Sequence, residues 1–63
     1  MKIKFVEDLT LFATKTKSIE VKHNVLTEIE AIDSADATGR VVLRYADGYE
    51  AIADELNFEV IEE

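Results

Sequence analysis

The segment from Arg40 to Ala53 constrains the fold more than any other part of the chain. It reads RVVLRYADGYEAIA, in which two runs of alternating apolar residues flank Ala46-Asp47-Gly48. Alternation on both sides of a short turn that ends in Asp-Gly predicts a β-hairpin. The segment therefore places two antiparallel strands in the second half of the chain.

The side chains of this hairpin favour one of two registers. A two-residue loop would set Arg44 opposite Ala51, whereas a three-residue loop sets Arg44 opposite Glu50 and Tyr45 opposite Tyr49. The longer loop is a type I turn followed by a left-handed residue, a conformation that Gly48 adopts cheaply because it lacks Cβ. The period of two then gives one hairpin face to Val41, Leu43, Tyr45, Tyr49, Ala51 and Ala53.

The length of the chain limits it to a single small domain, residues 1–63, with a thin core. It contains no cysteine and one histidine, so neither a disulfide nor a tetrahedral zinc site supports that core. No uncharged apolar run approaches the ~20 residues that span a bilayer, and Glu7 and Asp8 interrupt the opening segment before a signal-peptide core. We expect a cytoplasmic protein without membrane contact.

The charge of the chain is unevenly distributed. Residues 1–23 carry five lysines against three acids, whereas residues 24–63 carry two arginines against eleven acids, and the net charge is −7. Such a protein repels phosphates at long range, and it lacks the basic stripe with interleaved aromatics of single-strand binders. Direct binding of nucleic acid is therefore disfavoured. The acidity serves solubility, or it provides a face for a basic partner.

Short alternating runs predict further strands outside the hairpin. Ile3 and Phe5 mark an opening strand that residues 9–13 continue, and residues 19–23 form another strand or an ordered arm after a polar connection at 15–18. Residues 54–57 predict a short turn or single helical turn, which leads into a terminal strand from Phe58.

The segment from Asn24 to Gly39 fits two patterns. Its apolar residues match one helical stripe, but they also alternate with polar neighbours as in a strand, and residues 33–39 have the composition of a turn. We favour the strand, because it supplies a partner for residues 40–45 across that turn. The alternative is an α+β fold in which a helix at about 25–37 packs on the sheet.

With this choice, the sequence predicts an all-β fold of five antiparallel strands. We expect the alternating pattern to bury Ile29, Val41, Leu43 and Val60. The order of strand, irregular arm, strand, hairpin, short turn and strand resembles the SH3-like barrel. The resemblance rests on TEIEAID (27–33), GRVVLRYADG (39–48) and YEAIADELNFEVI (49–61).

The resemblance implies a small five-stranded SH3-like barrel and carries over no ligand. LTLFATK (9–15) stands where eukaryotic SH3 domains have an ALYDY-like motif, and the chain has no tryptophan. A proline-rich ligand requires an aromatic-lined groove. A methyl-lysine cage requires several converging aromatics, and only Tyr45 and Tyr49 are expected near one another.

Catalytic and metal-binding patterns are absent from the sequence. His23 is the single imidazole, and neither a cysteine nor a Gly-x-Ser-x-Gly elbow supplies a nucleophile for it to activate. Asp33 and Asp36 lack the spacing of an EF-hand loop. We expect no enzymatic activity, no metal and no cofactor, with His23 facing solvent or paired.

Binding to another protein, or to a second copy, is the function that remains. We expect a noncatalytic acidic interaction module. The alternative is an acidic inhibitor or nucleic-acid mimic, of the kind encoded by phages and mobile elements, that occupies a basic site. Tyrosine brings contact area at low entropic cost. The partner is therefore expected at the hairpin end, on Tyr45, Tyr49, Asp47 and Glu50.

Overall fold

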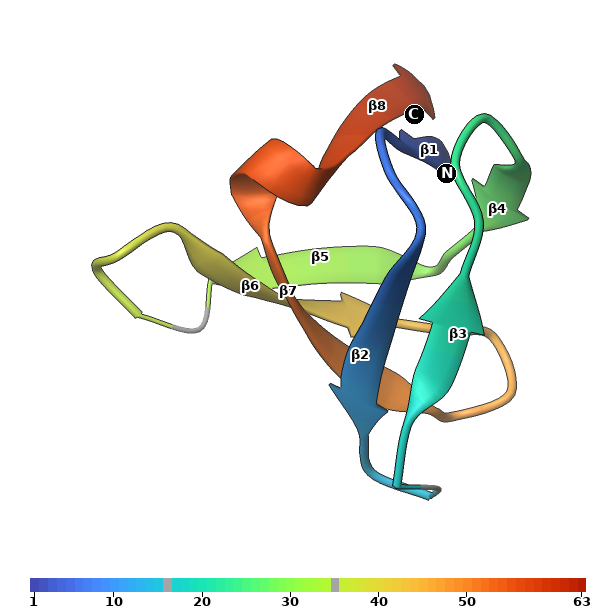
Figure 1. Cartoon of the computed structure of the whole chain (residues 1–63). Coiled ribbons are helices and arrows are strands. Elements are labelled where there is room, and N and C mark those ends of the chain that lie inside the picture. The colour runs from blue at the N-terminus through green and yellow to red at the C-terminus, as the bar shows by residue number, and fades with distance from the viewer. Residues whose placement is uncertain (16, 35) are drawn as a thin grey trace.

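The computed structural model describes residues 1–15, 17–34 and 36–63, and these residues form an all-β fold (Figure 1). The strands are β1 (Lys2–Phe5), β2 (Leu9–Ala13), β3 (Ile19–Val21), β4 (Leu26–Glu28), β5 (Ala31–Ser34), β6 (Arg40–Arg44), β7 (Glu50–Asp54) and β8 (Phe58–Glu62). A 3-10 turn, η1 (Glu55–Asn57), joins β7 to β8. Thr16 and Ala35, which fall in the expected polar connections, lie outside the described residues.

The expected all-β class is confirmed. Strands β4 and β5 occupy most of the segment for which a helix at 25–37 was the alternative, so the described part of that segment is extended rather than helical. Sequential pairing explains this outcome, because all four residues of β5 pair with residues 41–44 of β6 in antiparallel register.

The strands form two antiparallel sheets, and neither closes on itself within the described ranges. One has the order β4-β1-β8, and the other has the order β3-β2-β7-β6-β5. Over the described residues, eight short strands replace the five expected, because two predicted strands are each divided and the arm at 19–23 contributes β3. The chain changes sheets four times in the described structure: between β1 and β2, between β3 and β4, between β4 and β5, and between β7 and β8 (Figure 1).

The hairpin of β6 and β7 has the expected register. Arg44 lies opposite Glu50, and the N–H of Tyr45 donates to the carbonyl of Tyr49 over 2.8 Å. The N–H of Gly48 donates to the carbonyl of Tyr45 over 3.0 Å, and Gly48 has a φ of +90°. The three-residue loop and the left-handed glycine are confirmed.

Side chains from both sheets meet in one core. Its largest fully buried members are Ile3, Phe5, Ile29 and Leu43. The rings of Phe5 and Phe58 meet edge to face with centroids 6.1 Å apart. Each such burial contributes roughly 1.5–3 kcal/mol, so a small number of residues supports most of the fold.

Ile29 and Val60 were both expected inside, and only Ile29 is buried. Ile29 lies in the bend between β4 and β5, where its N–H donates to the carbonyl of Met1 over 2.9 Å. The prediction for Val60 is wrong, since its side chain is 44% exposed. Val60 lies opposite Ile3 on β8, which is an edge strand with an irregular register at this point. An edge strand has no neighbouring strand on its outer side, so the side chain of Val60 is not covered from that side.

Reciprocal hydrogen bonds hold the 3-10 turn in place. The N–H of Leu56 donates to Oδ1 of Asp54, and the N–H of Asp54 donates to Oδ1 of Asn57, each over 2.9 Å. The expected short helical turn at 54–57 is confirmed. Its physical reason is a capping box, which the side chains of Asp54 and Asn57 form. The carbonyl of Asn57 also accepts from Val6, which ties the turn to the end of β1.

Candidate interaction surfaces

The hairpin end holds the four residues that the sequence suggested as a partner-binding group. Tyr45 is half-buried and packs against the core. Its hydroxyl is buried and makes no hydrogen bond to any described residue. Burial, reinforced by the charge of Asp47, raises the pKa of Tyr45 above its usual 10.0. Most of this ring therefore belongs to the interior of the protein.

The other three residues of the hairpin end have neighbours within the fold. Nζ of Lys15 lies 5.5 Å from the centre of the Tyr49 ring and donates to the carbonyl of Asp47 over 3.2 Å. Oδ1 of Asp47 accepts from the N–H of Tyr49. Glu50 faces Arg44 at 3.7 Å. The structure does place the four residues at one end of the β6–β7 hairpin, but internal contacts occupy much of their polar and aromatic surface.

A second surface lies on the outer face of the five-stranded sheet. Phe12 on β2 lies directly opposite Ile52 on β7, and Ile52 in turn lies opposite Val42 on β6. Phe12 is 77% exposed and Ile52 is 49% exposed, whereas Val42 is partly buried. Because opposite residues in neighbouring strands project to the same side, these three side chains form an apolar row across the sheet.

A hollow of about 320 Å³ adjoins this apolar row. Its walls come from β2, the start of β6, β7 and η1, and they include Thr10, Arg40, Asp54 and Asn57 besides Phe12 and Ile52. The described pairing of β2 with β7 is limited to Phe12 and Ala13. Residues 9–11 of β2 pair with β3 on the opposite side of β2 and have no described partner on β7, and the hollow lies beside this unpaired part of β2.

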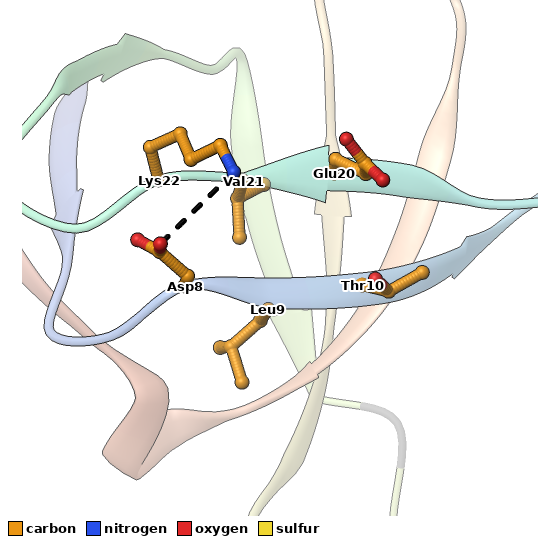
Figure 2. Close-up of a pocket in the computed structure, with 6 residues that line it drawn as sticks. All are labelled: Asp8, Leu9, Thr10, Glu20, Val21 and Lys22. Atoms are coloured by element: carbon orange, nitrogen blue, oxygen red, sulfur yellow. Dashed lines mark ion pairs between the residues drawn. The ribbon is translucent and has the colours of Figure 1, made fainter.

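A smaller hollow of about 150 Å³ lies on the β2–β3 hairpin (Figure 2). It shares Leu9 and Thr10 with the larger one, and its other walls are Asp8, Glu20, Val21 and Lys22. Figure 2 shows Asp8 and Lys22 pointing toward one another, and their closest charged atoms are 4.0 Å apart. Glu20 lies farther along β3, opposite Thr10. The two hollows therefore adjoin along β2.

His23 pairs with Asp8 beside the smaller hollow. Nδ1 of His23 lies 2.6 Å from Oδ1 of Asp8, and the backbone N–H of His23 donates to the same oxygen over 2.9 Å. The side-chain bond to His23, followed by the backbone bond, lowers the pKa of Asp8 below its usual 3.8. Both side chains are more than half exposed. The pair fastens the arm after β3 to the turn before β2.

The sequence did not lead to the prediction that Phe12 is exposed on the outer face. The sequence predicted a strand at residues 9–13 but did not indicate which of its side chains stay exposed. The signal was nevertheless present, because a phenylalanine occupies an outward position of an alternating strand, where polar residues are usual. Ile52 carries the same signal on β7.

Comparison of the chain with family models, with curated proteins and with solved structures finds no match. Within residues 1–15, 17–34 and 36–63, no helix has the length and apolar character to cross a membrane. Over the same residues, no three side chains of histidine, cysteine, aspartate or glutamate gather as a metal site.

Proposed function

We propose that this chain is a noncatalytic acidic protein-interaction module that binds its partner on the outer face of the five-stranded sheet. The observation that carries the proposal is the exposure of Phe12, 77%, directly opposite the half-exposed Ile52 and beside a hollow. Adjacent large apolar side chains that remain in water favour an interaction site, because covering them removes apolar surface from solvent. A phenylalanine of this kind is a suitable anchor for a partner.

We infer that the fold is a small SH3-like barrel. The order of β1, an arm that contains β2 and β3, the bent pair β4 and β5, the β6–β7 hairpin, η1 and β8 agrees with the element order on which the resemblance rests. The pairing of β1 with β8 also supports it, since it brings the first and last strands together. The fold contributes a rigid sheet under Phe12, and it implies no particular ligand.

The net charge of −7 supports a protein as the partner rather than a nucleic acid. The phosphates of a nucleic acid would be repelled, and a surface with exposed Phe12 and Ile52 offers area that a protein can cover. The alternative of an acidic mimic rests on charge alone, whereas the apolar row supplies an attraction that salt does not screen.

The experiment is capture of a partner from an extract of the native cells on the immobilised chain, at physiological salt and at ~0.5 M salt, where exposed ion pairs are screened. We expect a specific protein to be retained under both conditions. This partner should no longer be retained when the Phe12→Ser or the Ile52→Thr variant is immobilised in place of the wild-type chain. Val25→Thr removes a side chain that is 54% exposed at a position away from this face, and it serves as the matched control.

Two outcomes contradict the proposal. Retention by Phe12→Ser together with loss on Tyr49→Ala would move the binding surface to the hairpin end. Loss of the partner from the wild-type chain at ~0.5 M salt would favour the acidic mimic, in which ion pairs alone hold the complex.

A further inference from the structure

The two hollows share Leu9 and Thr10 in their walls, and together we call them the trough; its two ends are lined by side chains of different chemistry. We infer, on the basis of the proposed function, that this trough binds an extended basic segment of a partner protein. An apolar side chain of the segment packs on Phe12 and Ile52. A lysine or arginine of the same segment reaches Glu20 in the smaller hollow.

The apolar end of the trough is defined by Phe12 and Ile52. Both project from the same side of the paired strands β2 and β7, and the larger hollow lies against them. Its volume, about 320 Å³, is enough for a leucine-sized side chain and part of its backbone. Arg40 lines this hollow near Asp54, so a second cation is disfavoured here and an apolar side chain is preferred.

The cation-binding end of the trough is centred on Glu20. Asp8 in the same hollow is already engaged by His23 at 2.6 Å and faces Lys22 at 4.0 Å. Glu20 has no ion pair among the residues that the structure describes, and its side chain is exposed. A carboxylate beside a hollow and without a basic partner among the described residues is available to a lysine or arginine of a partner.

The geometry of the strands suits an extended ligand. Glu20 lies opposite Thr10 on the adjacent strand, and Thr10 and Phe12 are two positions apart on the same face of β2. Two positions along a strand span about 7 Å, which is also the distance between side chains i and i+2 of an extended peptide. An apolar residue and a basic residue two apart in one segment therefore reach both ends of the trough.

The overall charge favours a basic partner over a second copy of the chain. Two copies, each with a net charge of −7, repel one another. A cationic segment is attracted by the net charge of the chain and, at the trough, by Glu20, since the lysines of residues 1–23 leave this part of the chain without an excess of acids. Its association should therefore be faster at low salt than at high salt.

The test uses two synthetic octapeptides that share the same alternating leucines. One carries arginine between them and the other carries glutamate, and each is titrated into the isotopically labelled chain while backbone amide shifts are recorded. We expect the arginine peptide to shift the amides of Thr10, Phe12, Glu20 and Ile52 and the glutamate peptide to bind far more weakly. Glu20→Gln should weaken the affinity for the arginine peptide roughly two- to fivefold, which is the effect expected of an exposed ion pair. Glu63→Gln removes the same charge elsewhere in the chain and should leave the affinity for the arginine peptide nearly unchanged.

The outcomes separate this inference from the proposed function. If both peptides shift the Phe12 and Ile52 amides equally, the face binds peptide but the basic preference is wrong. If neither peptide shifts these amides at millimolar concentration, the inference of an extended basic segment fails, and the capture experiment alone decides the proposed function. If raising the protein concentration alone shifts them, a second copy is the occupant and the inference is overturned.

Discussion

The hairpin end and the outer sheet face both carry aromatic side chains, and the structure uses them in opposite ways. At the hairpin end, Tyr45 packs on the core and Lys15 lies over the ring of Tyr49. On the outer face, Phe12 projects from β2 with most of its surface in water. The tyrosines stabilise the fold, whereas Phe12 contributes little to it. Residue type alone does not identify a binding anchor, because neighbouring side chains decide which rings remain available.

The largest expected effect compares the two regions directly. Tyr45→Ala should lower the free energy of unfolding by about 2 kcal/mol, because it removes a half-buried ring that packs on the core. Phe12→Ala should change it by less than about 0.5 kcal/mol, since that ring is mostly in water. Urea denaturation of the two variants measures both. Equal losses in the free energy of unfolding would mean that Phe12 stabilises the fold, which contradicts its assignment as an exposed anchor for a partner.

Backbone strain in the hairpin loop gives the next effect. Gly48→Ala should cost about 1 kcal/mol, because Gly48 has a φ of +90° and a side chain is strained there. A Cβ at Gly48 would also come within 2.8 Å of Nζ of Lys15, although the end of a flexible side chain moves easily. Gly39 has a φ of +92°, so Gly39→Ala should cost a similar amount rather than the smaller amount expected of an adjustable loop.

Thermal melts of the two glycine variants decide this point. Negligible losses for both would contradict the left-handed assignment. A large loss at Gly48 alone would show that the loop before β6 adapts and the hairpin loop does not.

Removal of the buried hydroxyl of Tyr45 should have a smaller effect on stability, and this effect should depend on pH. Tyr45→Phe should leave stability unchanged or raise it by up to about 1 kcal/mol, because it removes a polar group without a hydrogen-bond partner among the described residues. Because burial raises the pKa of Tyr45, ionisation of its hydroxyl opposes folding, so the stability of the wild type is complete below pH 10 and falls as the pH rises through the folded-state pKa. The variant should therefore unfold less readily in alkali than the wild type. Tyr49→Phe is the control, and an alkaline gain of equal size there would contradict the assignment to Tyr45.

The smallest expected effect concerns Asp8 beside the outer face. Its lowered pKa means that its stabilising effect is complete above about pH 4, the range of a free aspartate, and is lost as the pH falls through the lower folded-state value. Asp8→Asn should therefore reduce the melting temperature slightly at neutral pH, with the difference narrowing in acid. Melting curves between pH 2 and pH 7 measure the trend. Glu7→Gln is the control, and a difference that stays constant with pH would contradict the role of the His23 pair.

The sequence by itself determined the elements that depend on neighbouring residues. The register from Arg40 to Ala53 follows from the Asp-Gly turn and the pairing of Arg44 with Glu50, and the structure has both. The turn at Asp54–Asn57 follows from a capping box that its own side chains complete. These interactions are local in the chain, so short patterns are sufficient to predict them.

Only the tertiary structure decided where strands change sheets and which outward side chains remain uncovered. Residues 2–5 and 9–13 alternate in the same way, yet β1 and β2 join different sheets because their partners, β8 and β7, come from the far end of the chain. Val60 alternates as a core residue but lies on an edge strand, and Phe12 follows an outward pattern but lacks a covering neighbour. Burial depends on which distant strand lies alongside, and alternation within one strand carries no information about that neighbour.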